Sequence, residues 1–347
     1  MKLSIRFQES RVGVVGTWRH RDTLTEGDVV TVVIDPDGKI PEITRSNNRA
    51  SWRLRLSEAE RERVETRRLT TYDRRANSGR PRARQVRALT NVAYGDDDLE
   101  MQRLDAYLVS SEKPTPAVIE FHGGGWRTGD KSDLEQYDGF LRALLAEGYS
   151  VILADYRLTP RSIWPSQGDD ARRVLDFVRS KAKEWNLDPE RIALVGGSAG
   201  AHLALAAGLP PGARVRAIID LWGPSDLEMI SPRVPRGEAL TALFDTSAEE
   251  YEKPGAALKR ALRDASPIHR VSVKSPPVFI VHDGPADASG ATDPRISGAN
   301  MGVHSAAFGL ALAARLQAAG VVHEVVIAPD ASRKFHQRAL EFLKRHL

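Results

Sequence analysis

Residues 191–203 read Arg-Ile-Ala-Leu-Val-Gly-Gly-Ser-Ala-Gly-Ala-His-Leu. A short apolar run ends here in Gly-x-Ser-x-Gly and continues directly into a helical pattern rich in Ala and Leu. This order predicts a buried strand, a sharp turn and a helix that begins beneath a serine. Gly196 and Gly200 leave room for the turn, since a side chain at either position would collide with the neighbouring strand or helix. Ser198 is therefore the candidate nucleophile, at the carboxyl end of a parallel strand and the positive end of a helix dipole.

A second motif lies upstream of the serine. The apolar run 117–121 leads directly into the sequence His122-Gly123-Gly124-Gly125-Trp126. A glycine run after a strand leaves several backbone N–H groups unobstructed and able to point into one concavity. Such donors stabilise the oxyanion that develops during acyl transfer, and the loss of one typically raises the barrier by about 3 kcal/mol. The combination of this loop with the serine turn predicts acyl-transfer chemistry.

The rest of this region alternates between strand and helix patterns. Residues 168–185 are amphipathic and predict a crossover helix, whereas the predicted strands are 104–109, 117–121, 149–154, 191–196, 216–221 and 278–282. Mostly apolar runs such as 149–154 are typical of parallel strands buried on both faces. This alternation predicts an α/β fold with a doubly wound, mostly parallel sheet. Residues 228–275 are polar with several prolines, and we interpret them as a short lid.

These motifs resemble those of the α/β-hydrolase carboxylesterases, of the hormone-sensitive-lipase-like and bacterial feruloyl- and acetyl-esterase type. The resemblance covers roughly residues 90–347, and further matching stretches are Asp155-Tyr156-Arg157-Leu158, Trp164-Pro165 with Asp170, Asp188-Pro189-Glu190-Arg191-Ile192 and Ala265-Ser266-Pro267-Ile268. It implies an oxyanion hole formed by Gly124, Gly125 and the backbone of Ala199. It also implies that His122 shapes the loop and is not the general base.

A serine nucleophile needs a histidine to take its proton and a carboxylate to orient that histidine, expected in the chain order Ser, Asp, His. The acid is expected just after the strand that ends at His282. We favour Asp287, which lies nearer the end of that strand. Asp293 is the alternative, because it better matches the Gly-x-x-Asp-Pro-x-Val/Ile pattern of the resembling family.

The general base departs from the family pattern. The resemblance places a histidine in the loop between the last strand, 321–327, and the last helix, 336–346, but Arg333 occupies that position. A guanidinium stays protonated at ordinary pH and is no general base. His336 is the nearby substitute, and an exposed histidine at a helix start is the competing interpretation. The other histidines that we considered, with weaker claims, are His304, His323 and His346.

Composition and charge limit the function classes. The chain has 347 residues, no cysteine and a net charge of +4. The absence of cysteine excludes disulfides, a thiolate nucleophile and a cysteine metal site. We see no long apolar run and no export signal, so we expect a cytoplasmic protein that does not engage the membrane.

The N-terminal part differs from the remainder in charge. Residues 1–88 carry 20 Lys and Arg against 12 Asp and Glu, whereas the remainder carries 30 against 34. Runs 2–7, 12–18 and 28–34 predict short strands, and 67–87 reads as an arginine-rich linker. We therefore expect a basic, β-containing extension over 1–88 and a hydrolase domain over 89–347. Charge runs alone rarely specify a partner, so nucleic-acid binding is the weaker interpretation.

The sequence thus predicts a serine carboxylesterase that acts on small acyl esters of the acetyl type, with a small-molecule ester as its partner and no metal or organic cofactor. The alternative is a catalytically impaired, hydrolase-fold binding protein. In that case the pocket persists but Arg333 has ended turnover, and its guanidinium holds a carboxylate or phosphate. Fold alone does not choose between these.

Overall fold

The computed structural model of the chain comprises two units, Met1–Ala83 and Arg84–Leu347. In the second unit the structure describes residues 85–98, 100–133, 138–230, 237–283, 302–328 and 331–347. In the first unit it describes four short strands, which pair antiparallel: β1 (Leu3–Ser4) with β2 (Thr17–Trp18), and β3 (Val29–Val33) with β4 (Arg49–Arg53). The predicted runs overlap β1, β2 and β3, whereas β4 was not predicted.

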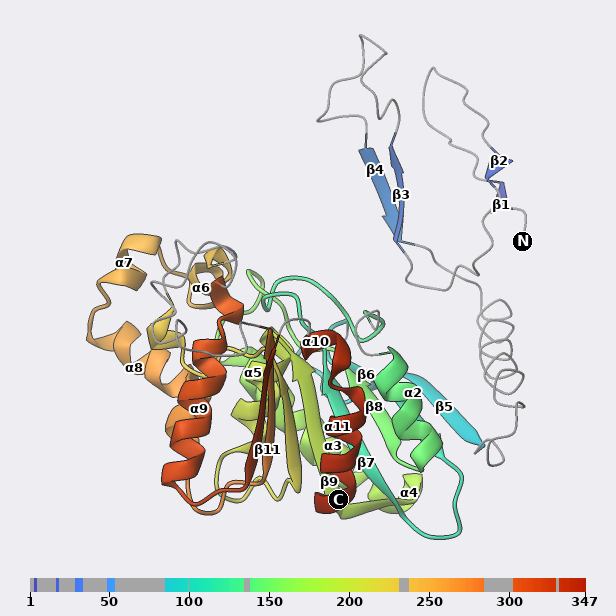
Figure 1. Cartoon of the computed structure of the whole chain (residues 1–347). Coiled ribbons are helices and arrows are strands. Elements are labelled where there is room, and N and C mark those ends of the chain that lie inside the picture. Colours follow the sequence, from blue (N-terminus) through green and yellow to red (C-terminus); the bar gives the residue numbers. More distant parts are fainter. Residues whose placement is uncertain are drawn as a thin grey trace. The chain divides into compact units, whose positions relative to one another are not determined.

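The described residues of the second unit form an eight-stranded sheet in the order β12-β11-β10-β9-β7-β8-β6-β5 (Figure 1). The strands are β5 (Val86–Ala93), β6 (Arg103–Val109), β7 (Thr115–Phe121), β8 (Ser150–Ala154), β9 (Leu187–Gly197), β10 (Ala217–Leu221), β11 (Val278–Asp283) and β12 (His323–Ala328). β5 and β6 run antiparallel, and the six strands from β8 to β12 in the sheet order are parallel. The predicted fold class is confirmed. β5 begins at Val86, inside the segment that the sequence assigned to the linker.

Helices cover both faces of this sheet (Figure 1). One face, here called the α5 face, packs against α3 (Ser166–Ser180), α5 (Ala199–Gly208) and α9 (Ala306–Ala318), and α4 (Ala182–Trp185) follows α3. The other, here called the α11 face, packs against α2 (Asp138–Glu147), α10 (Ala331–Lys334) and α11 (His336–His346). Every residue of β8 and β10 is buried, as expected for central strands covered on both sides.

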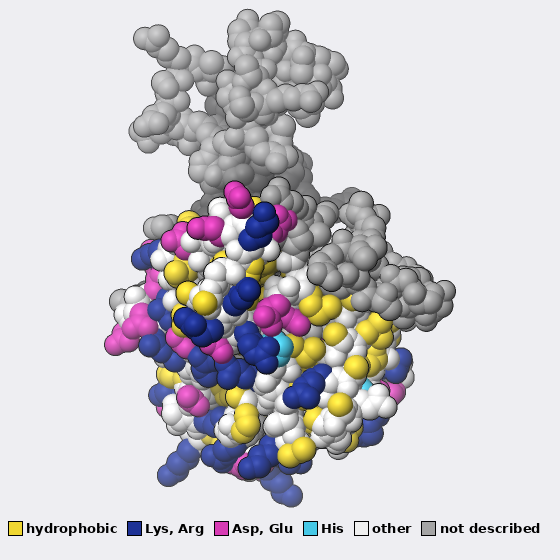
Figure 2. All heavy atoms as spheres, turned by 90° about the vertical axis from the view of Figure 1, so that its left-hand side faces the viewer, with side chains coloured by type: hydrophobic (Ala, Val, Ile, Leu, Met, Phe, Trp, Pro, Cys, Tyr) yellow, Lys and Arg dark blue, Asp and Glu magenta, His cyan; other side chains and the backbone are white. Residues whose placement is uncertain are grey.

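The chain between β10 and β11 forms an excursion, here called the cap segment, over residues 227–270. Its described elements are η1 (Leu227–Met229), α6 (Glu238–Leu243), α7 (Ala248–Glu252), α8 (Ala256–Ala265) and η2 (Pro267–Arg270). Its two ends are joined, because the Ile268 N–H donates to the Ser225 carbonyl at 3.0 Å and the Leu227 N–H donates to Ser266 Oγ at 2.8 Å. Figure 2 shows the side of the unit with α7, α8 and α9, where basic and acidic side chains are interspersed.

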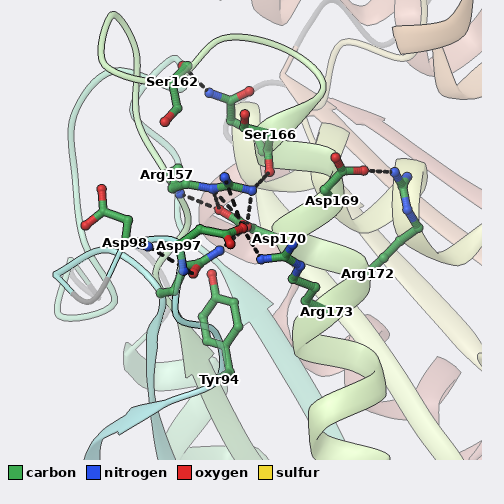
Figure 3. A network of polar contacts seen from close by, with 12 residues as sticks. Tyr94, Asp97, Asp98, Arg157, Ser162, Ser166, Asp169, Asp170, Arg172 and Arg173 are labelled. Atoms are coloured by element: carbon green, nitrogen blue, oxygen red, sulfur yellow. Dashed lines mark hydrogen bonds and ion pairs between the residues drawn. The ribbon is translucent and has the colours of Figure 1, made fainter.

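A buried ion pair fixes the start of α3 to the chain that follows β8 (Figure 3). The Arg157 guanidinium donates to the Asp170 carboxylate at 2.8 Å, and Gln102 Nε2 donates to the same carboxylate at 2.7 Å. Asp170 is fully buried, and its carboxylate raises the pKa of Arg157 through hydrogen bonding. The pair holds in place the segment that includes Tyr156, which contacts the glycine loop of the candidate site.

Among the helices of the described residues, none has the length and apolar character that crossing a bilayer requires.

Candidate active site

Ser198 stands in a strained turn between β9 and α5. Its backbone has φ 56° and ψ −120°, and its N–H donates to the Leu221 carbonyl at 2.9 Å. A Cβ on Gly196 would overlap the backbone of Gly200, and a Cβ on Gly200 would overlap the carbonyl oxygen of Phe121. Only glycine permits these approaches, so the two glycines allow α5 to begin directly against the end of β7. The serine turn predicted from the sequence is present.

The Ser198 hydroxyl contacts a histidine that the sequence did not favour. Ser198 Oγ lies 2.7 Å from His304 Nε2, within hydrogen-bonding distance. His304 is the last residue of η3 (Gly302–His304), and Ser305 caps the following α9 through its hydroxyl, which accepts from the Ala307 N–H. The histidine thus comes from the connection between β11 and α9, the connection that was expected to supply the acid.

His336 does not take the position predicted for it. Its ring packs on the α11 face, with its centroid 4.6 Å from that of Phe335 and 5.9 Å from that of Phe140. A Cβ built on Gly139 would lie 3.3 Å from the His336 ring. The structure thus differs from the expectation for His336: His304 contacts Ser198, and α11, which begins at His336, packs against α2. Arg333 belongs to the short helix α10, and its side chain lies outside the described part of the structure.

The remaining predicted residues are the two candidate acids and the histidines with weaker claims. Asp287 and Asp293, the two candidate acids, lie in 284–301, outside the described residues, so the acid stays a prediction. His323 is on β12, where its Nδ1 bonds the Val321 carbonyl at 2.9 Å, and the His346 ring packs against Phe342.

The glycine loop lies beside the nucleophile. A Cβ on Gly123 would be 3.7 Å from Ser198 Cβ, and Gly124 and Gly125 have φ of 107° and 60°. The Gly124 carbonyl turns back to accept from the N–H groups of Arg127 and Thr128, at 3.1 Å each. These left-handed conformations favour glycine and reverse the chain next to Ser198. The glycine loop thus adjoins the nucleophile, and its role as an oxyanion hole stays a prediction.

His122 shapes this loop from beneath. Its Nδ1 donates to the Gly123 carbonyl at 2.7 Å, and its ring stacks on Tyr156 with centroids 4.3 Å apart. The Tyr156 hydroxyl donates to the His122 carbonyl at 2.9 Å. Burial lowers the pKa of His122, so the imidazole is neutral and its Nδ1–H is available as a donor. These contacts agree with the structural role that the resemblance implied.

Aromatic and aliphatic side chains surround the loop and the start of α5. Trp126 and Trp164 contact the ring of His202 edge-on, with centroids 5.2 and 5.3 Å apart. His202 Nε2 donates to the Ala265 carbonyl at 2.7 Å, and burial lowers its pKa to about 4. A Cβ on Gly125 would lie 3.2 Å from Ala239 Cβ, so α6 of the cap segment adjoins the glycine loop. The space beside Gly125 is narrow.

Two buried carboxyl groups flank β9. Burial raises the pKa of Glu120, near the end of β7, to about 8, and that of Asp220, near the end of β10, to about 7. Asp220 accepts from the Gly223 N–H at 2.8 Å, whereas both carboxyl oxygens of Glu120 lack a hydrogen-bond partner among the described residues. Glu120 is therefore protonated at neutral pH. Neither group has a sequence signal beyond its place in an apolar strand.

The described residues contain one group of side chains of the types that bind metal ions. Asp226, Glu228 and His269 offer ligand atoms within 4.8 Å of one another where the cap segment begins and ends. His269 Nε2 lies 2.8 Å from Glu228 Oε2, and Asp226 accepts from the Glu228 N–H at 3.0 Å. Glu228 is exposed, and these contacts already join the two ends of the cap segment.

Comparison with known proteins identifies relatives with related sequences. A family model described as BD-FAE matches residues 104–292, more than half of the chain. A probable carboxylic ester hydrolase, LipM, of Mycobacterium tuberculosis is 29% identical over 181 residues, which are 48% of this chain and 40% of that protein. A versiconal hemiacetal acetate esterase of Dothistroma septosporum is 33% identical over 118 residues, 33% of this chain and 35% of its own. The chain thus spans less than half the length of each of these two relatives.

Solved structures show the same fold. A truncated carbohydrate esterase from gut microbiota aligns with a TM-score of 0.62 at 22% identity, over 76% of this chain and 97% of that one. A Thermogutta terrifontis esterase with bound propionate aligns with a TM-score of 0.54 at 21% identity, over 76% and 94% of the two chains. Together with the sheet order and the serine turn, these likenesses establish the α/β-hydrolase fold.

Proposed function

We propose that this chain, which belongs to the BD-FAE family, is a serine carboxylesterase that hydrolyses small acyl esters through an acyl-enzyme. The observation that carries the proposal is the 2.7 Å contact between Ser198 Oγ and His304 Nε2 in a serine turn beside a glycine loop. A serine hydroxyl is a weak nucleophile until such a base takes its proton. The ester hydrolases and esterases among the relatives support the same reaction class.

In the proposed mechanism Ser198 Oγ bonds to the ester carbonyl carbon while its proton passes to His304 Nε2. The carbonyl oxygen becomes an oxyanion, which the backbone N–H groups of Gly124, Gly125 and Ala199 stabilise. His304 then returns the proton to the leaving alkoxide, and the carbon–oxygen bond to the alcohol breaks. Water attacks the acyl-enzyme by the same route in reverse, which releases the acid and restores Ser198.

Asp287 remains our proposed acid, with Asp293 as the alternative. Both precede His304 in the chain, so the expected order Ser, Asp, His is kept with this base. The acid would accept from the ring nitrogen of His304 that does not face the serine, and so hold the imidazole in the tautomer that leaves Nε2 free to accept a proton.

Small acyl groups, acetyl above all, are the proposed substrates. The approach of Ala239 to Gly125 and the buried indole of Trp126 restrict the space beside the oxyanion loop. Among the relatives, one is named an acetate esterase, and one similar solved structure is titled an acetyl ester-xyloside bifunctional hydrolase. These names support acetyl esters of hydroxylated compounds, such as sugars, as the first substrates to test.

The test is hydrolysis of p-nitrophenyl acetate by the wild-type chain, Ser198→Ala and His304→Ala, with His336→Ala as the matched histidine control. Removal of a member of such a catalytic unit costs roughly 10⁴-fold or more in kcat. We expect this loss of kcat for Ser198→Ala and for His304→Ala, and near wild-type turnover for His336→Ala. A wild type no faster than Ser198→Ala would contradict the esterase proposal and favour a hydrolase-fold protein that binds without turnover.

A further inference from the structure

A second histidine lies beneath the turn that presents His304. His282, near the end of β11, is fully buried, and its Nδ1 lies 3.3 Å from the backbone carbonyl oxygen of His304. A carbonyl oxygen only accepts hydrogen bonds, so the His282 Nδ1–H is the donor. The contact joins β11 directly to the residue that touches Ser198.

The His282 ring has the properties of a fixed donor. Burial lowers the pKa of His282 to about 4, although its hydrogen bond with the His304 carbonyl acts in the opposite direction. The ring is therefore neutral over the working range of an esterase, with its proton on Nδ1. When His304 takes the serine proton, no second cation lies beneath it. The Nε2 atom of His282 has no hydrogen-bond partner among the described residues, so Nδ1 makes the polar contact of the His282 ring.

Helix α9 holds the same histidine from the other side. A Cβ built on Gly309 would lie 2.9 Å from His282 Nε2, closer than a real side chain approaches. The Ser225 hydroxyl donates to the Phe308 carbonyl at 2.9 Å and so fixes the first turn of α9 to the end of β10. Because α9 begins immediately after His304, these contacts limit the movement of η3.

We infer that His282 is a positioning residue for the general base: its Nδ1–H holds the His304 carbonyl and thereby sets the imidazole of His304 against Ser198 Oγ. This inference rests on the proposed role of His304. It means that β11, besides forming part of the sheet, carries the residue that anchors the base, His282. Displacement of a catalytic group by about 1 Å costs on the order of 10²-fold in rate, so a single hydrogen bond at this place has a measurable effect.

The test compares His282→Leu with His282→Asn. Leucine fills a similar volume without a donor, whereas the asparagine amide can present an N–H where Nδ1 lies. We expect His282→Leu to lower kcat by about 10- to 100-fold with KM nearly unchanged, as for a misplaced catalytic group, and His282→Asn to restore most of it. The residual activity of His282→Leu should rise with pH without a plateau, because hydroxide replaces the displaced base. Equal thermal unfolding temperatures of the two variants exclude a general loss of structure.

Two results would overturn the inference: a folded His282→Leu with wild-type kcat and pH profile, or equal losses in the leucine and asparagine variants. A readout independent of activity separates this failure from failure of the esterase proposal. The His282 Nδ1–H should give a slowly exchanging imidazole proton resonance that is absent from His282→Asn. It should persist in His304→Ala, which keeps the backbone carbonyl. If wild type lacks that resonance, the hydrogen bond from His282 to the His304 carbonyl is absent, whatever the activity. If wild type shows the resonance but does not hydrolyse the ester, only the esterase proposal fails.

Discussion

Two connections at the carboxyl edge of the sheet differ in what they bring to the nucleophile. The connection from β11 to α9 carries His304, which contacts Ser198 Oγ at 2.7 Å, whereas the connection from β12 to α11 carries Arg333 and His336. Both follow parallel strands, and both end where a helix begins. The difference is the face: α9 packs on the α5 face together with the helix that begins at the serine, and α11 packs on the opposite face. In this structure the histidine that contacts the serine precedes the helix on the α5 face.

The largest expected effect comes from moving the base between the two connections. His304→Ala should lose roughly 10⁴-fold or more of kcat. Adding Arg333→His to that variant should restore less than tenfold, because Ala331 of the same helix α10 and the adjoining Phe335 pack on the α11 face. The measurement is p-nitrophenyl acetate turnover of the single and double variants. Full rescue by Arg333→His would show that both connections can present a base, which would contradict the contrast drawn between them.

A smaller effect should follow from crowding the anchor of the base. Gly309→Ala places a methyl group against the His282 ring, so we expect kcat to fall by about tenfold through displacement of the turn that carries His304. Gly255→Ala is the matched control, since nothing lies within 4 Å of a Cβ there. Both are read from kcat and from the thermal midpoint. If the two glycine variants behave alike, tight packing at Gly309 does not serve the base.

The α11 face can be probed through Glu120, whose buried carboxyl has its pKa raised to about 8. The folded state holds this proton more tightly than the unfolded chain does. The contribution of Glu120 to the free energy of unfolding therefore falls as pH rises from about 4.5 to about 8. Glu120→Gln removes that dependence. We expect the variant to match wild type at pH 5 and to exceed it by roughly 3 kcal/mol at pH 8, at about 1.4 kcal/mol for each pKa unit. Urea unfolding at the two pH values measures the difference, and parallel curves would contradict it.

The smallest effect is expected at His336. His336→Phe keeps an aromatic ring beside Phe140 and Phe335, so the free energy of unfolding should change by less than about 1 kcal/mol and kcat by less than twofold. Chemical denaturation and esterase assays check both. A large loss of kcat with unchanged stability would return His336 to the catalytic machinery and contradict the contrast between the two connections.

Much of this molecule could be read from short-range signals. The serine turn and the glycine loop depend on residues next to one another, such as Gly196 with Gly200, and the alternation of buried strands with helices indicates a doubly wound sheet. The position of the histidine depends on something else. His304 directly precedes the N-cap of α9, and His336 begins α11, but the sequence does not show which face each helix covers. The packing of α9 on the α5 face, which the structure shows, is what distinguishes His304 from His336.

The contacts that join the two ends of the cap segment could not be predicted from the sequence either. The predicted lid, 228–275, contains most of the cap segment, but the hydrogen bond from Leu227 to Ser266 joins positions far apart in the chain. Whether this segment closes over a substrate stays a prediction. The acid likewise depends on 284–301, where the choice between Asp287 and Asp293 stands as the sequence left it.

The location of His304 ahead of β12 has a practical consequence for dividing the molecule. Every residue to which we give a chemical role precedes the last strand and helix, which are fixed to the rest by contacts such as that from Arg191 to the carbonyl of Leu347. The segment from His323 to Leu347 could therefore be supplied as a separate peptide. Complementation by that peptide would rebuild the edge of the sheet without delivering a reacting group, so turnover would report reassembly alone. The chain is in this sense a natural candidate for a split-enzyme sensor.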